Sequence, residues 1–105
     1  MGERTANVVP GNIGETLTEL AALIAQRRKE LPENSYTTKL FTEPVDYVLK
    51  KLNEESLELA LAIKDDDFEH IRYEAADLVY HLLVALERSE VSLEELAGEL
   101  NARRH

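Results

Sequence analysis

Residues 50–81 carry the most informative pattern in the chain and read KKLNEESLELALAIKDDDFEHIRYEAADLVYH. Two acidic clusters lie in this stretch among apolar, helix-forming residues: Glu54-Glu55-x-x-Glu58 and Glu74-x-x-Asp77. Residues three or four apart share one face of a helix, so each cluster points its carboxylates to one side. The short link at residues 64–67 allows the second helix to fold back antiparallel on the first. We therefore expect four or five carboxylates to face one another across a narrow groove.

A groove of this kind needs a cation, because buried like charges repel one another and lose hydration. Several hard oxygen ligands together suit Mg²⁺, with Mn²⁺ as a second possibility. The competing interpretation is a set of surface ion pairs four residues apart, Lys50 with Glu54 and Lys51 with Glu55. Two features favour the metal site: Glu58 is flanked by leucines, and Asp77, a poor helix former, lies in the middle of an apolar helix.

The composition narrows the class of protein. At 105 residues we expect a tail over residues 1–12 and a single small domain over residues 13–105. Cysteine is absent, which excludes disulfides, thiolate zinc sites and cysteine nucleophiles, and is compatible with a cytoplasmic location. No apolar run is long enough to span a membrane, and a net charge of −9 disfavours nucleic acid as a partner. A small anionic substrate remains compatible with this charge if a metal mediates the contact.

The hydrophobic periodicity predicts four helices and no strand, hence an all-α, four-helix bundle. Pro32 ends the first helix, and the third runs to about Arg88. The predicted caps are Asn12, Thr42, Asp66 or Asp67, and Ser92 in a capping box with Glu95, and the fourth helix should turn Leu93, Leu96 and Leu100 inward. The second helix is apolar over much of its circumference, which is typical of a bundle interior or a subunit interface.

Residues 33–43, ENSYTTKLFTE, are expected to form a polar connector. Its hydroxyl and ammonium groups are donors suited to phosphate oxygens, although a loop without a binding role is the alternative. His81 is expected to be a hydrogen-bonded, partly buried histidine, or else to orient a carboxylate or contact a substrate phosphate.

Together, three stretches give the chain a family resemblance. The acidic signature EExxE…ExxD, with SYTTKLF at residues 35–41 and EAADLVYHLL at residues 74–83, resembles the all-α MazG-like nucleotide pyrophosphohydrolases, and within them the phosphoribosyl-ATP pyrophosphohydrolases of histidine biosynthesis. The resemblance covers roughly residues 15–105. The sequence departs from the family pattern at Asn53, where glycine is expected, and at Ser56, where alanine is usual; every carboxylate of the signature is retained.

The resemblance implies Mg²⁺-dependent hydrolysis of phosphoribosyl-ATP to phosphoribosyl-AMP and pyrophosphate by a homodimer whose sites lie near the subunit interface. The implied metal ligands are Glu55, Glu58, Glu74 and Asp77. The implied catalytic residues are Glu54, which would orient or deprotonate the water unless it ligates metal itself, and Glu55. The candidates for substrate contact are Ser35, Tyr36, Lys39, Lys50, Lys51 and His81.

Two other functions fit the sequence less well. A housecleaning hydrolase of free nucleoside or deoxynucleoside triphosphates would use the same carboxylates, but the SYTTKLF connector and the lysine pair favour the phosphoribosylated substrate. A non-catalytic helical dimerisation module, or a metal-binding regulator, gives no reason to keep Asp77 inside an apolar helix.

Overall fold

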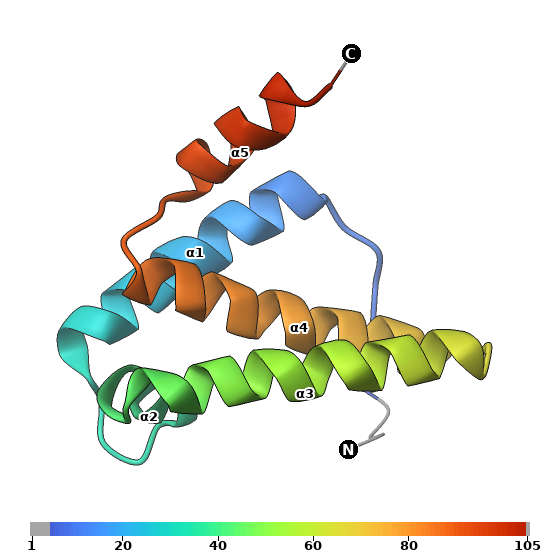
Figure 1. Ribbon diagram of the computed structural model, residues 1–105, viewed down its shortest axis with the longest axis horizontal. Coiled ribbons are helices and arrows are strands. Elements are labelled where there is room, and N and C mark those ends of the chain that lie inside the picture. Colours follow the sequence, from blue (N-terminus) through green and yellow to red (C-terminus); the bar gives the residue numbers. More distant parts are fainter. Residues whose placement is uncertain (1–4, 105) are drawn as a thin grey trace.

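The computed structural model describes residues 5–104, and in this range it contains five α-helices and no strand (Figure 1). The helices are α1 (Ile13–Glu30), α2 (Tyr36–Thr42), α3 (Val45–Lys64), α4 (Phe68–Arg88) and α5 (Leu93–Ala102). The predicted all-α architecture is confirmed. Of the tail expected over residues 1–12, residues 5–12 form no helix and residues 1–4 lie outside the described residues.

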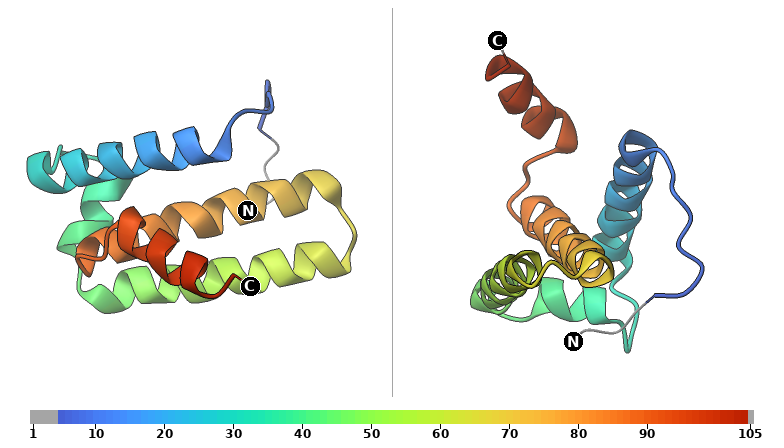
Figure 2. Two further views of the ribbon diagram at one scale, coloured as in Figure 1. Left: turned by 90° about the horizontal axis from the view of Figure 1, so that it is seen from above. Right: turned by 90° about the vertical axis from the view of Figure 1, so that its right-hand side faces the viewer.

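Helices α3 and α4 form the antiparallel hairpin that the sequence predicts (Figure 1). The Asp67 side chain begins α4 by accepting a hydrogen bond from the backbone N–H of His70 at 3.3 Å, so the second of the two proposed caps is the one used. Figure 2 shows α4 in the middle of the molecule, with α3 on one side and α1 on the other. One central core joins the first four helices through Ile24, Leu40, Val48, Leu83 and Val84.

The polar connector predicted at residues 33–43 contains a helix, α2, that the sequence analysis missed, so the count of four helices is wrong. The Ser35 side chain caps α2 by accepting from the N–H of Thr38 at 3.4 Å, and Leu40 is fully buried. At the far end of α2, Arg88 donates to the carbonyl oxygens of Leu40 and Glu43, each at 2.8 Å. Seven residues are too few to form a stable helix alone, so burial and these tertiary bonds stabilise α2.

Thr42 is not the cap of the following helix. It is the last residue of α2, and its hydroxyl donates back to the carbonyl oxygen of Thr38 at 3.0 Å. Helix α3 begins one residue after Pro44, which occupies the N-cap position without a side-chain hydrogen bond. The other predicted caps, Asn12 and the Ser92–Glu95 capping box, are confirmed.

Helix α5 projects away from the other helices (Figure 2, right) and has no buried residue. Leu93 packs against the core, but Leu100 is 56% exposed, so the expectation that it turns inward is wrong for the single chain. Apolar side chains are also exposed on α3, where Leu57, Leu61 and Ile63 each show at least half of their surface to solvent. None of the helices described is long and apolar enough to cross a membrane.

Candidate metal centre

Three carboxylates converge between α3 and α4. Glu55 and Glu58 lie on one face of α3, and Glu74 reaches them from α4, so that one oxygen from each lies within 4.8 Å of the others. The spacing of three residues on α3 and the antiparallel hairpin produce this convergence. The structure thus brings together three of the four residues that the sequence analysis proposes as metal ligands.

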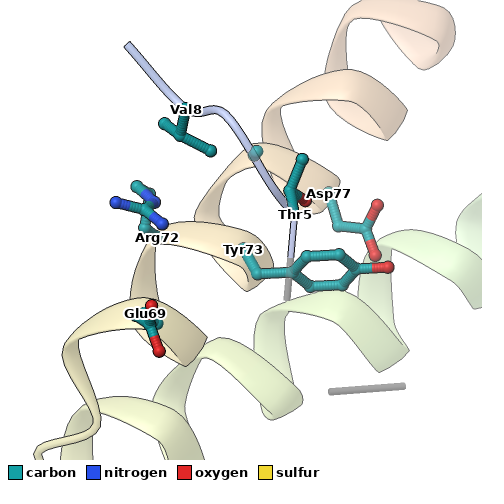
Figure 3. Close-up of a pocket in the computed structure, with 7 residues that line it drawn as sticks. Thr5, Val8, Glu69, Arg72, Tyr73 and Asp77 are labelled. Atoms are coloured by element: carbon teal, nitrogen blue, oxygen red, sulfur yellow. The ribbon is translucent and has the colours of Figure 1, made fainter. Parts of the chain in front are cut away.

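Asp77 lies beside this trio, close enough to share a hydrogen bond with Glu55. It also borders a cavity of about 350 Å³ between α4 and the N-terminal segment. Figure 3 shows Tyr73 and Asp77 on the side of α4 that faces α3, with Thr5 and Val8 passing across the cavity. Asp77 therefore lies between the acidic cluster and this cavity.

The environment of Glu55 opposes its negative charge. Burial is the main cause that raises the pKa of this carboxyl from 4.5 to about 8, followed by the hydrogen bond and negative charge of Asp77 and by the charges of Glu58 and Glu74. Burial and the charge of Glu74 also raise the pKa of Glu58. At neutral pH the metal-free cluster therefore holds at least one proton that a cation could replace.

Two oxygens in the cluster provide a direct test of whether these residues fit a cation. Glu55 Oε2 and Glu74 Oε1 are buried and have no hydrogen-bond partner among the described residues. An unpartnered buried acceptor costs free energy, and several carboxylate oxygens are the ligands that Mg²⁺ and Mn²⁺ prefer. The donor set and its orphaned oxygens fit a hard divalent cation.

Tyr36 and His81, both proposed as substrate contacts, hydrogen-bond to each other. His81 Nδ1 lies 2.8 Å from the carbonyl oxygen of Asp77, which can only accept, so Nδ1 donates. In the neutral ring Nε2 then accepts from the Tyr36 hydroxyl at 2.7 Å. Burial raises the pKa of Tyr36 to about 12, with nearby Glu55 and Asp77 contributing, so this hydroxyl keeps its proton. Both ring nitrogens of the buried His81 are therefore engaged.

Three of the remaining predicted residues, Lys39, Lys51 and Ser35, have contacts outside the acidic trio. The ammonium groups of Lys39 and Lys51 lie 5.3 and 5.8 Å from the centre of the Tyr47 ring. Lys51 also pairs with Glu54, with 3.6 Å between Nζ and Oε1. Ser35 uses its side-chain oxygen to cap α2.

Lys50 is not brought to the cluster. It is exposed and borders a hollow on α3 that Glu54, Asn53 and Leu57 also line. Lys50 and Lys51 are adjacent in the sequence and so point about 100° apart around a helix, and Lys51 is the one that forms an ion pair with Glu54.

Two residues at the site were missed by sequence reasoning. Tyr47 lies between Lys39 and Lys51, and its signal was weak because an aromatic residue in a helix usually packs in the core. His70 contacts Glu74, and the spacing of four residues could have revealed it.

Comparisons with known proteins identify relatives over most of the chain. A family model described as phosphoribosyl-ATP pyrophosphohydrolase matches residues 17–104. A phosphoribosyl-ATP pyrophosphatase of Haloarcula marismortui is 50% identical over 93 residues, covering 87% of this chain and 95% of the relative. One of Metallosphaera sedula is 43% identical over 89 residues, covering 85% and 96%. A histidine biosynthesis bifunctional protein of Bacillus subtilis is 46% identical over 87 residues, covering 83% of this chain and 42% of the relative.

Proposed function

The chain belongs to the phosphoribosyl-ATP pyrophosphohydrolase family, and we propose that it uses a divalent cation to hydrolyse phosphoribosyl-ATP to phosphoribosyl-AMP and pyrophosphate. Family membership makes it a hydrolase of histidine biosynthesis. The observation that carries the metal proposal is the convergence of Glu55, Glu58 and Glu74 within 4.8 Å, with two buried oxygens left without partners.

In this proposal Glu55, Glu58 and Glu74 hold the cation, and Asp77, beside Glu55, completes the ligand set. Bound Mg²⁺, or Mn²⁺ in its place, would offset the charge of the triphosphate and make a nearby water more acidic. The carboxylates of α3 and α4 supply the negative charge that would hold this cation between the two helices.

Glu54 is the residue that we propose to orient or deprotonate the attacking water. It is half-buried on α3, next in the chain to a proposed ligand, and Lys51 lies 3.6 Å from its carboxylate. Lys39 and Lys51, held near Tyr47, are the candidates for contact with the substrate phosphates.

Tyr36 and His81 have a shared role in the proposal. The tyrosine hydroxyl is fixed by the histidine, and the histidine is fixed by the backbone of Asp77. The pair ties α2 to the part of α4 that carries Asp77, so that the donors of α2 stay next to the acidic cluster. The one hydroxyl proton of Tyr36 is already donated to His81, so a phosphate oxygen could accept from Tyr36 only by displacing that bond.

We also propose that the chain acts in the cytoplasm as a homodimer. The exposed leucines of α3, Leu57 at 60% and Leu61 at 51%, are the surface that a second copy would cover. Light scattering after gel filtration tests the dimer: the wild type should have twice the mass of the chain, and Leu61→Asp should lower it to the monomer. A wild type that is monomeric at assay concentration would contradict the proposal.

The test of the catalytic proposal is pyrophosphate release, measured with Mg²⁺ on phosphoribosyl-ATP and on a panel of ordinary nucleoside and deoxynucleoside triphosphates. We expect a strong preference for phosphoribosyl-ATP and no release in EDTA. Preference for the simple triphosphates would move the protein to the housecleaning hydrolases. No release from any substrate by the folded protein would favour a non-catalytic helical module.

A further inference from the structure

His70 forms a hydrogen bond with Glu74 that none of the roles above uses. It lies one turn before Glu74 on α4, and its Nε2 is 3.0 Å from Glu74 Oε2. The Glu74 side chain is completely buried, whereas 20% of the His70 side chain is exposed. The hydrogen bond therefore joins a fully buried carboxylate of the acidic cluster to a side chain that is partly exposed to solvent.

The direction of this hydrogen bond follows from the chemistry of the two groups. A carboxylate that ligates a cation can only accept, so in the metal-bound site His70 Nε2 carries the proton and donates a hydrogen bond to Oε2. The other oxygen, Oε1, is buried and has no partner among the described residues. One oxygen of Glu74 is thus held by protein, and the second remains available as a ligand beside Glu55 and Glu58.

The backbone of His70 is held by the N-terminal cap of α4. It lies in the first turn of α4, and its backbone N–H donates to the capping side chain of Asp67. Because Nε2 already donates to Glu74, its lone pair is not free to bind a metal, and His70 is not among the residues whose ligand atoms converge. Its geometry suits orientation of a ligand rather than ligation.

We propose that His70 is a positioning residue: it fixes the Glu74 carboxylate so that its second oxygen faces Glu55 and Glu58, and this raises the affinity of the site for a divalent cation. The inference rests on the metal site of the proposed function. Partners that orient a metal ligand in this way change metal affinity by about 10- to 100-fold when they are removed.

The experiment measures Mn²⁺ binding by electron paramagnetic resonance, without substrate, for the wild type, His70→Leu and His70→Gln. Leucine fills similar space and favours helix but cannot donate, whereas the glutamine amide can donate to Glu74. We expect His70→Leu to weaken Mn²⁺ binding by about 10- to 100-fold. His70→Gln is the matched control and should recover most of the affinity.

A second measurement separates positioning from a general loss of structure. Circular dichroism should show equal helix content in all three proteins, and the Mg²⁺ concentration for half-maximal pyrophosphate release should rise in His70→Leu while kcat at saturating Mg²⁺ returns close to the wild-type value. If His70→Leu loses helix, His70→Ala, which removes the ring without filling the space, replaces it in the same comparison with His70→Gln.

Two results would overturn the inference: unchanged Mn²⁺ affinity in a folded variant that cannot donate, or a glutamine variant that binds as weakly as the leucine variant. Both leave the proposed function in place. Conversely, a wild type that binds Mn²⁺ and loses it in His70→Leu, yet releases no pyrophosphate, would support the positioning role and contradict the proposed function.

Discussion

Glu55→Gln should stabilise the metal-free protein while it removes the function of the site. Glu55 is 8% exposed, and one of its carboxyl oxygens has no partner among the described residues. Its charge is opposed by burial and by the neighbouring carboxylates of Asp77, Glu58 and Glu74. A neutral amide of the same size removes this repulsion and can donate a hydrogen bond to Asp77.

The magnitude follows from the pKa. The rise from 4.5 to about 8 corresponds to about 5 kcal/mol, since each pKa unit is worth ~1.36 kcal/mol. This figure is a ceiling because Glu55 shares its repulsion with coupled neighbours, and we expect the substitution to recover about 2 to 4 kcal/mol above pH 8.

The raised pKa of Glu55 also sets the direction in which the stability of the protein changes with pH. Because the folded state binds the Glu55 proton more tightly than the unfolded state, the stability associated with this group is present in full below pH 4.5 and is lost as the pH rises through about 8. Between these values the metal-free wild type should become less stable. Glu55→Gln should lose most of this slope and keep the smaller part that comes from Glu58, whose pKa is also raised.

The assay is urea unfolding followed by circular dichroism in EDTA, at intervals from pH 5 to pH 9. At pH 8 and above, Glu55→Gln should be more stable than the wild type; with Mg²⁺ the order should reverse, because only the wild type retains the full ligand set. A Glu55→Gln protein that is less stable than the wild type in EDTA at pH 9 would refute the reasoning about repulsion in the cluster.

Four further substitutions test the rest of the acidic cluster and other parts of the structure. Asp77→Asn and Glu58→Gln should each lower pyrophosphate release by at least about a hundredfold while circular dichroism still shows a helical fold, since metal chemistry is worth several kcal/mol; near-normal turnover in either would remove that residue from the ligand set. Tyr36→Phe should lower the free energy of unfolding by about 1 to 2 kcal/mol in urea, because His81 Nε2 loses its partner in a buried position; equal stability would show that this bond contributes little. Leu40→Ala should cost about 2 to 5 kcal/mol in thermal or urea unfolding, because Leu40 is fully buried in the core; a loss under 1 kcal/mol would mean that α2 contributes little to folding.

The hairpin and its carboxylates were the most predictable part of the molecule. Residue spacing placed Glu55 and Glu58 on one helix face, and the short link after α3 forced α4 to return alongside it. Both inferences rest on residue spacing and on the length of the link, which can be read directly from the sequence. The convergence with Glu74 needed only the additional fact that antiparallel neighbours pack closely.

Helix α2 could not be predicted in the same way, because its stability is not local. Its seven residues are mostly polar, and what makes them helical is the burial of Leu40 and the bonds from Arg88, which lies 48 residues further along the chain. The inward orientation expected for Leu100 failed for a related reason. An apolar stripe shows which side of a helix avoids water, but not whether the chain itself covers that side.

The hydrogen-bond partners within the site were also beyond the sequence. His81 could be foreseen as buried and bonded, but its pairing with Tyr36 depends on where α2 docks. The contact between His70 and Glu74 is the exception, because a spacing of four residues on one helix is visible in the sequence.

The most direct measurement is an anomalous difference map from crystals of the protein soaked in Mn²⁺. The convergence of Glu55, Glu58 and Glu74 predicts a strong peak between α3 and α4, within bonding distance of these three carboxylates and of Asp77. An empty groove at saturating Mn²⁺, or a peak bound elsewhere while pyrophosphate release remains Mn²⁺-dependent, would contradict the assignment of this cluster as the metal centre.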